Sequence, residues 1–350
     1  MIKPRYKKLN ILGLGYSVGT SNKFLEAEVV VVKDFQELDN LKDKVKGKIV
    51  VYNFKFTSYA DQNAYRFSGA SRAAKHGAVA VFVRTLAPFS LYNPHTGMQR
   101  YVDDIDKIPA VSITIEDADL FERIQKRNQT IVLRFFSENQ LAGTSTSKNV
   151  VSELTGSTNP KDVVIVSGHI DSWDVGQGAL DDGGGAFISW RALSVIKELG
   201  ISPKLTMRSI LWTAEEMGLI GAKSYVERHR HESFSIAMES DFGTFEPLGI
   251  TFSGKNLTSQ CIVKEILNQL PKSFNGTRLR LSNEGSDISI FDKAGIPISS
   301  LETKNEKYFY YHHSDADTMN ALNPGELDRN TALWTAVSYA LASLDQRLPR

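Results

Sequence analysis

The fold class is indicated by the stretch Val163-Val164-Ile165-Val166-Ser167-Gly168-His169-Ile170-Asp171. In it, a β-branched apolar run is followed at its end by a histidine and an aspartate. Ten residues after Asp171 come Asp181 and Asp182, followed by a run of glycines (183–185) where the backbone is expected to approach another group closely. Histidine and carboxylates after a buried strand are typical of a metal site. The stretch therefore predicts half of such a site, with the other half further along the chain.

Size and composition place the chain among ordinary soluble globular proteins. Its 350 residues are enough for two domains, and 41% hydrophobic and 23% charged residues are unremarkable proportions. The formal net charge of +1 gives no global field that would recruit nucleic acid. No apolar run approaches the ~18 residues needed to span a bilayer, so we expect neither a nucleic-acid partner nor a membrane span.

Cysteine usage and short motifs give weaker indications about the compartment. The basic segment from Met1 to Lys8 is followed by Asn10 and glycines, so we expect no signal peptide within this chain. Cys261 is the only cysteine, which excludes an intrachain disulfide and a thiolate metal cage. We expect it to be a small buried residue on a helix. Three Asn-x-Thr sequons slightly favour a secretory route, at Asn128, Asn256 and Asn275.

The first part of the chain is expected to form a self-contained α/β or α+β domain over residues 21–145. Short β-branched runs predict strands near residues 27–32, 48–53, 78–83, 109–115 and 130–136. Helices are predicted over residues 62–76 and 116–126, the first closed by Gly77 as its C-cap. No His, Asp and Glu cluster here at ligand spacing, so this domain is expected to cover or contact something.

The second part of the chain begins after a polar passage over residues 137–148, which marks a domain boundary. From there strands alternate with helices. Strands are predicted at residues 149–154, 162–169, 206–213, 234–240 and 296–301, and helices at 184–199, 217–231, 256–270 and 324–344. Alternation at this spacing favours an α/β domain over residues 146–350, with a mostly parallel sheet flanked by helices.

Ionisable side chains follow successive strands of this predicted sheet. His169 and Asp171 end the first, the pair Glu215-Glu216 follows the second, and Asp241 follows the third, while the late turn contributes His312, His313 and Asp317. Each alone has a structural explanation, such as a helix cap, a turn or a surface pair. Ligands bind at the carboxyl ends of strands in open α/β sheets, so their joint occurrence at one sheet edge favours a functional site.

Two histidines and three carboxylates suit two divalent cations, and zinc fits this donor set. Asp181 could bridge both ions, so that each would keep one imidazole and one further carboxylate. Such a pair of metals clamps an attacking water and polarises a substrate carbonyl. One glutamate then remains uncommitted, and hydrolysis needs a general base beside the water.

The motifs occur in the order His169-x-Asp171, Asp181-Asp182-Gly183, Thr213-Ala214-Glu215-Glu216, Glu239-Ser240-Asp241 and His313-x-x-x-Asp317. In this order and spacing the chain resembles the co-catalytic dizinc peptidases, the family that includes bacterial leucyl aminopeptidases and glutamate carboxypeptidase. The resemblance extends over nearly the whole chain and includes the first-domain string from Ser90 to Gly97. It implies an exopeptidase that hydrolyses dipeptides or short peptides, carboxypeptidase-like, by a metal-bridged water and a glutamate base.

The resemblance also implies a role for each candidate residue. His169 and Asp241 would hold one zinc, Glu216 and His313 the other, and Asp181 would bridge them. Glu215 would take the proton of the water and pass it to the leaving amine. Asp171 would orient His169 through its other ring nitrogen. Asp317 would do the same for His313. His313 is preferred to His312 as the ligand because it lies four residues before Asp317. A cis peptide between Asp181 and Asp182 is implied as well.

At the level of the whole protein, the resemblance implies a protease-associated domain over residues 21–145 that interrupts the peptidase domain, with residues 1–20 as a remnant of the latter. It further implies a glycosylated homodimer in the secreted or lysosomal compartment. Four other interpretations remain open from the sequence: an aminopeptidase on the same scaffold, a catalytically inert form of this chain, a one-zinc acyltransferase resembling glutaminyl cyclase, and a non-catalytic binding module.

Overall fold

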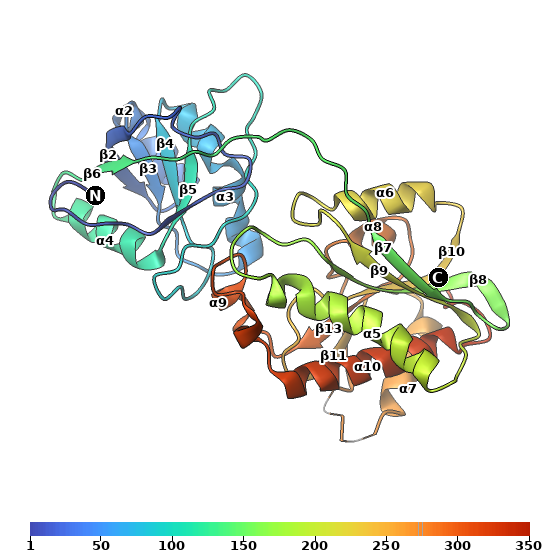
Figure 1. Ribbon diagram of the computed structural model, residues 1–350. Coiled ribbons are helices and arrows are strands. Elements are labelled where there is room, and N and C mark those ends of the chain that lie inside the picture. The colour runs from blue at the N-terminus through green and yellow to red at the C-terminus, as the bar shows by residue number, and fades with distance from the viewer. Residues whose placement is uncertain (272, 275) are drawn as a thin grey trace. The chain divides into compact units, whose positions relative to one another are not determined.

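The computed structural model describes residues 1–271, 273–274 and 276–350. The chain divides into two compact units, each with its own β-sheet (Figure 1). The first unit contains residues 1–145 together with 312–316, and the second contains residues 146–311 and 317–350.

The first unit is built on a sheet whose strands lie in the order β1-β5-β4-β3-β2-β6. β2 to β5 run parallel, and β1 and β6 are antiparallel edges. The bounds are β1 (Ile11–Gly13), β2 (Leu25–Val32), β3 (Ile49–Tyr52), β4 (Ala80–Arg84), β5 (Ala110–Ile113), β6 (Val132–Phe135), α1 (Phe35–Asn40), α2 (Lys42–Val45), α3 (Tyr59–Ala74) and α4 (Ile115–Lys126). Alternating strand residues bury their side chains on opposite faces: Val50 packs with Ala73 of α3, and Val51 packs with Phe121 of α4.

The predicted strands and helices of this unit are confirmed, including the turn at Gly77, whose φ of 78° is left-handed. Residues 1–20 differ from the expectation that they belong to the peptidase domain. β1 pairs antiparallel with β5, and Leu14 is buried in the core of the first unit beside Val83. Both the backbone pairing and the burial of Leu14 place this segment in the first unit.

The second unit contains a mixed sheet in the order β12-β11-β13-β10-β8-β9-β7. The strands β13, β10, β8 and β9 are parallel, whereas β7 is antiparallel to β9 and β11 is antiparallel to β13. The bounds are β7 (Val150–Leu154), β8 (Asn159–His169), β9 (Leu205–Trp212), β10 (Ser233–Glu239), β11 (Pro247–Phe252), β12 (Arg278–Leu281) and β13 (Ile298–Thr303). The mostly parallel α/β sheet predicted from the sequence is thus present at its centre.

Helices cover both faces of this sheet (Figure 1). α5 (Gly184–Glu198), α7 (Leu257–Asn268) and α10 (Pro324–Ala342) share a core with Val164 and Val166, whereas α6 (Ile220–Arg228) and α8 (Ser289–Lys293) pack against Val163 and Ile165. Shorter elements are η1 (Ala179–Gly183), α9 (Tyr308–Tyr311) and η2 (Met319–Ala321). β8 is therefore buried on both faces, which explains its continuous apolar run.

Two features of the second unit differ from the sequence-based expectations. The strands β11 and β12 were not predicted, and Cys261 is exposed rather than buried. α7 buries Ser259, Val263 and Leu267, which repeat at intervals of four, and Cys261 lies off that face. In the part of the chain that the structure describes, no helix combines the length and the apolar character needed to span a bilayer.

Candidate metal centre

The ionisable residues predicted for the site lie at the carboxyl ends of β8, β9 and β10. His169 is the last residue of β8, Asp241 comes two residues after β10, and Asp181 lies in η1, before α5. Because these parallel strands are neighbours in the sheet, their ends bring the side chains together. The convergence of these side chains that the sequence predicts is thus present in the structure.

His169, Asp181 and Asp241 form a buried group with the donor set of a metal site. The His169 Nε2 lies 3.2 Å from Asp181 Oδ1 and 3.1 Å from Asp241 Oδ1. One ligand atom from each residue lies within 4.8 Å of the other two. Burial opposes protonation of His169, but its contacts with Asp181 and Asp241 outweigh burial and raise its pKa well above the usual value. A cation is therefore favoured at this position.

The backbone around Asp182 explains the glycine run. The Asp181–Asp182 peptide is cis, as expected. The Asp182 carboxylate accepts hydrogen bonds from the backbone nitrogens of His169, at 3.0 Å, and Gly185, at 3.1 Å. A Cβ on Gly185 would lie 2.0 Å from the carbonyl oxygen of Ser240. The absence of a side chain at Gly185 thus allows η1 to lie against the end of β10.

Asp171 contacts both His169 and the two glutamates after β9. The His169 Nδ1 lies 2.8 Å from the backbone carbonyl oxygen of Asp171 and 3.9 Å from its carboxylate. The carboxylate instead accepts hydrogen bonds from the backbone nitrogens of Glu215, at 3.0 Å, and Glu216, at 3.2 Å. The expected partnership of Asp171 with the Nδ1 nitrogen of His169 is therefore present in the structure, and its short contact is made by the main-chain oxygen.

Further contacts position the two glutamates after β9. The Trp173 indole nitrogen donates a 2.7 Å hydrogen bond to Glu216 Oε2, a contact that sequence reasoning missed. Burial raises the pKa of Glu215 well above its usual value, and the nearby Asp241 raises it further. A glutamate with a raised pKa beside a histidine and aspartates is suited to proton transfer.

The turn over residues 283–287 supports Asp241 from behind. Ser286 donates one hydrogen bond to Glu239 Oε2 through its backbone, at 2.8 Å, and another to Asp241 through its hydroxyl. Burial raises the pKa of Glu239 to about 8. Asp287 is fully buried, and among the described residues neither of its carboxylate oxygens has a hydrogen-bond partner. Tyr308 is buried against Phe242.

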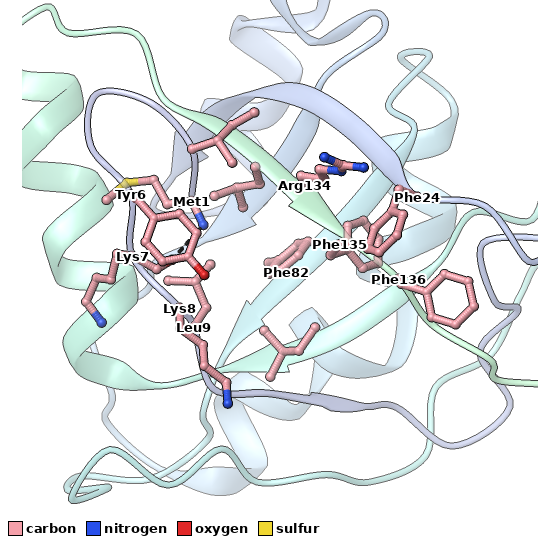
Figure 2. A pocket seen from close by; sticks show the side chains of 13 residues that line it. Met1, Tyr6, Lys7, Lys8, Leu9, Phe24, Phe82, Arg134, Phe135 and Phe136 are labelled. Atoms are coloured by element: carbon pink, nitrogen blue, oxygen red, sulfur yellow. Dashed lines mark hydrogen bonds between the residues drawn. The ribbon is translucent and has the colours of Figure 1, made fainter.

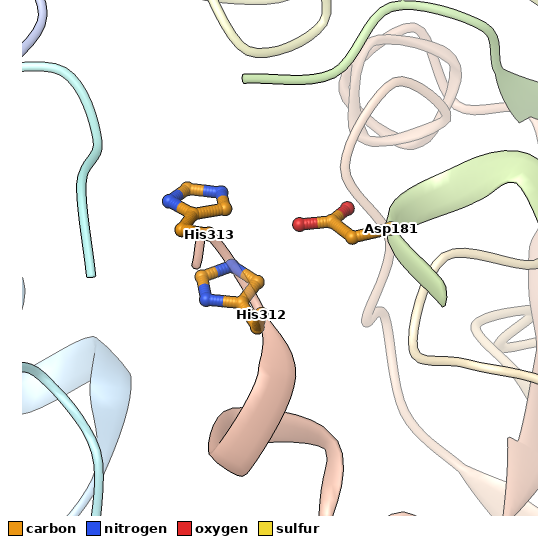
Figure 3. Close-up of side chains that lie close together, drawn as sticks. All are labelled: Asp181, His312 and His313. Atoms are coloured by element: carbon orange, nitrogen blue, oxygen red, sulfur yellow. The ribbon is translucent and has the colours of Figure 1, made fainter. Parts of the chain in front are cut away.

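His312 and His313 belong to the first unit. Figure 3 draws them with Asp181; the two imidazole rings stack with centroids 3.6 Å apart. The His313 Nδ1 lies 3.1 Å from the carbonyl oxygen of Thr96. Asp317, expected to orient His313, accepts hydrogen bonds from the backbone nitrogens of Leu180, at 2.7 Å, and Asp181, at 3.1 Å.

One surface hollow borders these residues, and a second lies in the first unit. One, of about 380 Å³, is bordered by His169, Asp171 and Asp182 and by the aromatic side chains of Phe187 and Trp190. The other, of about 470 Å³, lies in the first unit beside β6 (Figure 2) and its walls are mostly apolar and basic residues, including Lys7, Lys8, Phe24 and Arg134. The candidate site residues His169 and Asp171 therefore border the smaller of these two hollows.

The residues present fit zinc. Imidazole nitrogen and carboxylate oxygen are its usual protein ligands. The carboxylates around His169 repel one another. Burial is the largest cause of the raised pKa values of Asp182, Glu215 and Asp287, and this repulsion raises them further. A divalent cation would offset this repulsion.

Comparison with known proteins agrees with this fit. Residues 149–338 match Peptidase family M28, and the chain belongs to this family. It is 47% identical to carboxypeptidase Q of Mus musculus over 352 aligned residues, which cover 100% of this chain and 74% of that protein. The resemblance stated from the sequence is thereby confirmed, and the chain is a peptidase, a zinc exopeptidase similar to carboxypeptidase Q.

Solved structures support the same fold. The crystal structure of a peptidase M28 precursor from Shewanella amazonensis superposes with a TM-score of 0.91 at 30% identity, covering 100% of this chain and 81% of that one. A zinc aminopeptidase from Bacillus subtilis gives a TM-score of 0.68 at 19% identity, covering 97% and 81% respectively, and shows the fold alone.

Proposed function

We propose that this chain hydrolyses dipeptides or short peptides with two zinc ions and Glu215 as the general base. The observation that carries the proposal is the convergence of His169, Asp181 and Asp241 beside the Glu215-Glu216 pair that Asp171 holds. When bound, zinc polarises a scissile carbonyl and lowers the pKa of the attacking water. Glu215 takes the proton from that water and returns it to the leaving amine.

The two ions are assigned to different residues. His169 and Asp241 would hold one, Glu216 and His313 would hold the other, and Asp181 would be shared by both. The contact of Trp173 with one oxygen of Glu216 supports the assignment of that carboxylate, because ligands are usually oriented by a hydrogen bond from a neighbouring side chain. His313 lies four residues before Asp317, which binds the backbone of Asp181.

The substitution Glu215→Gln tests the base. The amide keeps the size of the side chain but cannot accept the proton, so we expect zinc content to be retained while kcat falls by about 10²- to 10⁴-fold. Glu227→Gln, at an exposed position of α6, is the matched control and should leave kcat unchanged. Unchanged turnover in Glu215→Gln refutes the assignment, and loss of a zinc ion identifies Glu215 as a ligand instead.

A carboxypeptidase is favoured over an aminopeptidase by the 47% identity to carboxypeptidase Q, whereas the zinc aminopeptidase shares the fold at 19%. Cleavage of N-blocked and C-blocked dipeptides separates the two activities. A carboxypeptidase cleaves the N-blocked substrate and leaves the C-blocked one intact, and the reverse result establishes the aminopeptidase.

We also propose that the protein is a glycosylated homodimer of the secretory or lysosomal compartment. Asn128 supports this, because it is exposed on the turn after α4. Asn256 instead caps α7, with its amide nitrogen 3.1 Å from the Arg350 carbonyl, and Asn275 lies outside the described residues. A mass decrease on endoglycosidase treatment and a light-scattering mass of two chains are the expected results.

A further inference from the structure

Residues 312–316 belong to the first unit although the chain on both sides of them belongs to the second. Their contacts explain this. The backbone nitrogen of Thr96 donates a 2.8 Å hydrogen bond to the carbonyl of His313, and the Asn93 amide donates a 2.9 Å bond to Ser314 Oγ. The segment from Asn93 to Thr96 therefore holds the loop that carries His313.

Thr96 also fixes the imidazole of His313. Its carbonyl oxygen lies 3.1 Å from His313 Nδ1, so the proton resides on that nitrogen and Nε2 keeps its lone pair. His313 has a φ of 60°, a left-handed conformation that is unfavourable for a residue with a Cβ. The reciprocal bonds to Thr96 hold the residue in this conformation, so one backbone position sets both the main chain and the ring of His313.

Arg66, on α3, fixes the carbonyl of Thr96 in turn. Its Nη1 donates a 3.1 Å hydrogen bond to that oxygen, and its Nη2 donates a 2.5 Å bond to the hydroxyl of Tyr59. A Cβ on Gly97 would lie 2.2 Å from the Arg66 Cζ, so the guanidinium reaches this carbonyl only because Gly97 has no side chain. Arg66 is 8% exposed, and the buried cation has these two oxygen acceptors in place.

We propose that Arg66 is a positioning residue for the zinc ligand His313, acting through the carbonyl oxygen of Thr96. This inference rests on the proposed function, which assigns His313 as a ligand. A positioning role predicts a selective effect on the ion held by Glu216 and His313, whereas a merely structural role predicts lower stability with both zinc affinities unchanged.

The test measures zinc affinity by competition with a chromophoric chelator on the full chain. Arg66→Gln removes the cation, and we expect the affinity for one zinc to fall by about 10- to 100-fold while the other is unchanged. Arg66→Lys, which retains one charged donor, should restore part of this loss. Arg72→Gln is the matched control, since Arg72 lies on the same helix but packs over Phe35, and should leave both affinities unchanged.

His313→Ala separates this inference from the proposed function. If this variant still binds two zinc ions with unchanged affinities, the assignment of His313 as a ligand is wrong. If it loses one zinc but Arg66→Gln binds both as tightly as the unaltered chain, the positioning role of Arg66 is overturned. Should Arg66→Gln fail to fold by circular dichroism, Arg66→Lys is measured instead, because it keeps the charge but cannot bond both Thr96 and Tyr59 in the same way. It should weaken the same zinc ion, and unchanged affinities in Arg66→Lys then overturn the inference.

Discussion

Replacing Asp171 by asparagine separates the two ways in which this residue supports the site. Its carboxylate accepts the backbone N–H groups of Glu215 and Glu216, one on each oxygen. Its carbonyl oxygen, 2.8 Å from His169 Nδ1, is unaffected by the substitution. The side-chain amide of the Asp171→Asn variant would still accept one N–H group through its oxygen, but its NH₂ group would oppose the other. The turn that carries the base is therefore perturbed while His169 keeps its partner.

The contacts set the size of the effect. A hydrogen bond to a charged acceptor contributes roughly 1.5–3 kcal/mol, and one of the two bonds is lost. If the whole loss appears in the transition state, at about 1.4 kcal/mol per factor of ten, kcat/KM falls by roughly 10- to 150-fold. A zinc ion held by His169 and Asp241, as proposed above, should stay bound, because the Asp171 carboxylate lies 3.9 Å from the imidazole.

The assay combines dipeptide hydrolysis under kcat/KM conditions with zinc analysis of the same preparation. Asp174→Asn, at an exposed position of the same loop, is the control and should match the unaltered protein in both measurements. If Asp171→Asn instead loses zinc, and excess zinc restores its activity, then the carboxylate acts on His169 and the reasoning from the main-chain contact is refuted.

Two further predictions concern stability. Burial raises the pKa of Glu239 to about 8 from 4.5 and that of Glu215 in the same direction, so the folded metal-free protein binds more protons than the unfolded chain across this range. Its free energy of unfolding should therefore fall as pH rises from about 4.5 to 8. Thermal melts in EDTA whose melting temperature rises over this range would contradict the prediction. Added zinc should remove this dependence of stability on pH. Gly185→Ala forces a Cβ to 2.0 Å from the Ser240 carbonyl and should lower the melting temperature by several degrees, whereas Gly325→Ala in α10 has room and should raise it slightly. Equal melting temperatures for the two alanine variants would show that η1 tolerates a shift of its backbone.

The strands that carry the site were predictable because they are buried on both faces. β8, β9 and β10 are β-branched and apolar runs, and their predicted bounds lie within a few residues of those observed. β11 was missed because Pro247 and Gly249 interrupt its pattern, and both residues are unfavourable in strand interiors. β12 was missed because its arginines alternate with leucines on a partly exposed edge strand.

Residue types at the strand ends indicated which side chains meet, but not which atoms do so. His169, Asp181 and Asp241 could be grouped because β8 and β10 end at one edge of the sheet and η1 follows β8 in the chain. The role of Asp171 could not be resolved, because its carbonyl and its carboxylate both lie near the site and only the path of the loop decides which one faces His169. The same path brings Trp173 to Glu216, a contact for which the sequence carries no spacing rule.

The contribution of the first unit was hidden for a different physical reason. Thr96 contacts His313 through its main-chain nitrogen and oxygen. Any residue with an N–H group could make these contacts, so the residue type at position 96 does not reveal them. The residue types that do matter there are Gly97 and Arg66, which lie far apart along the chain and carry no ligand chemistry of their own. If His313 binds zinc as proposed, its ring is oriented by residues that carry no ligand chemistry, so a search of the sequence for ligand motifs passes over them.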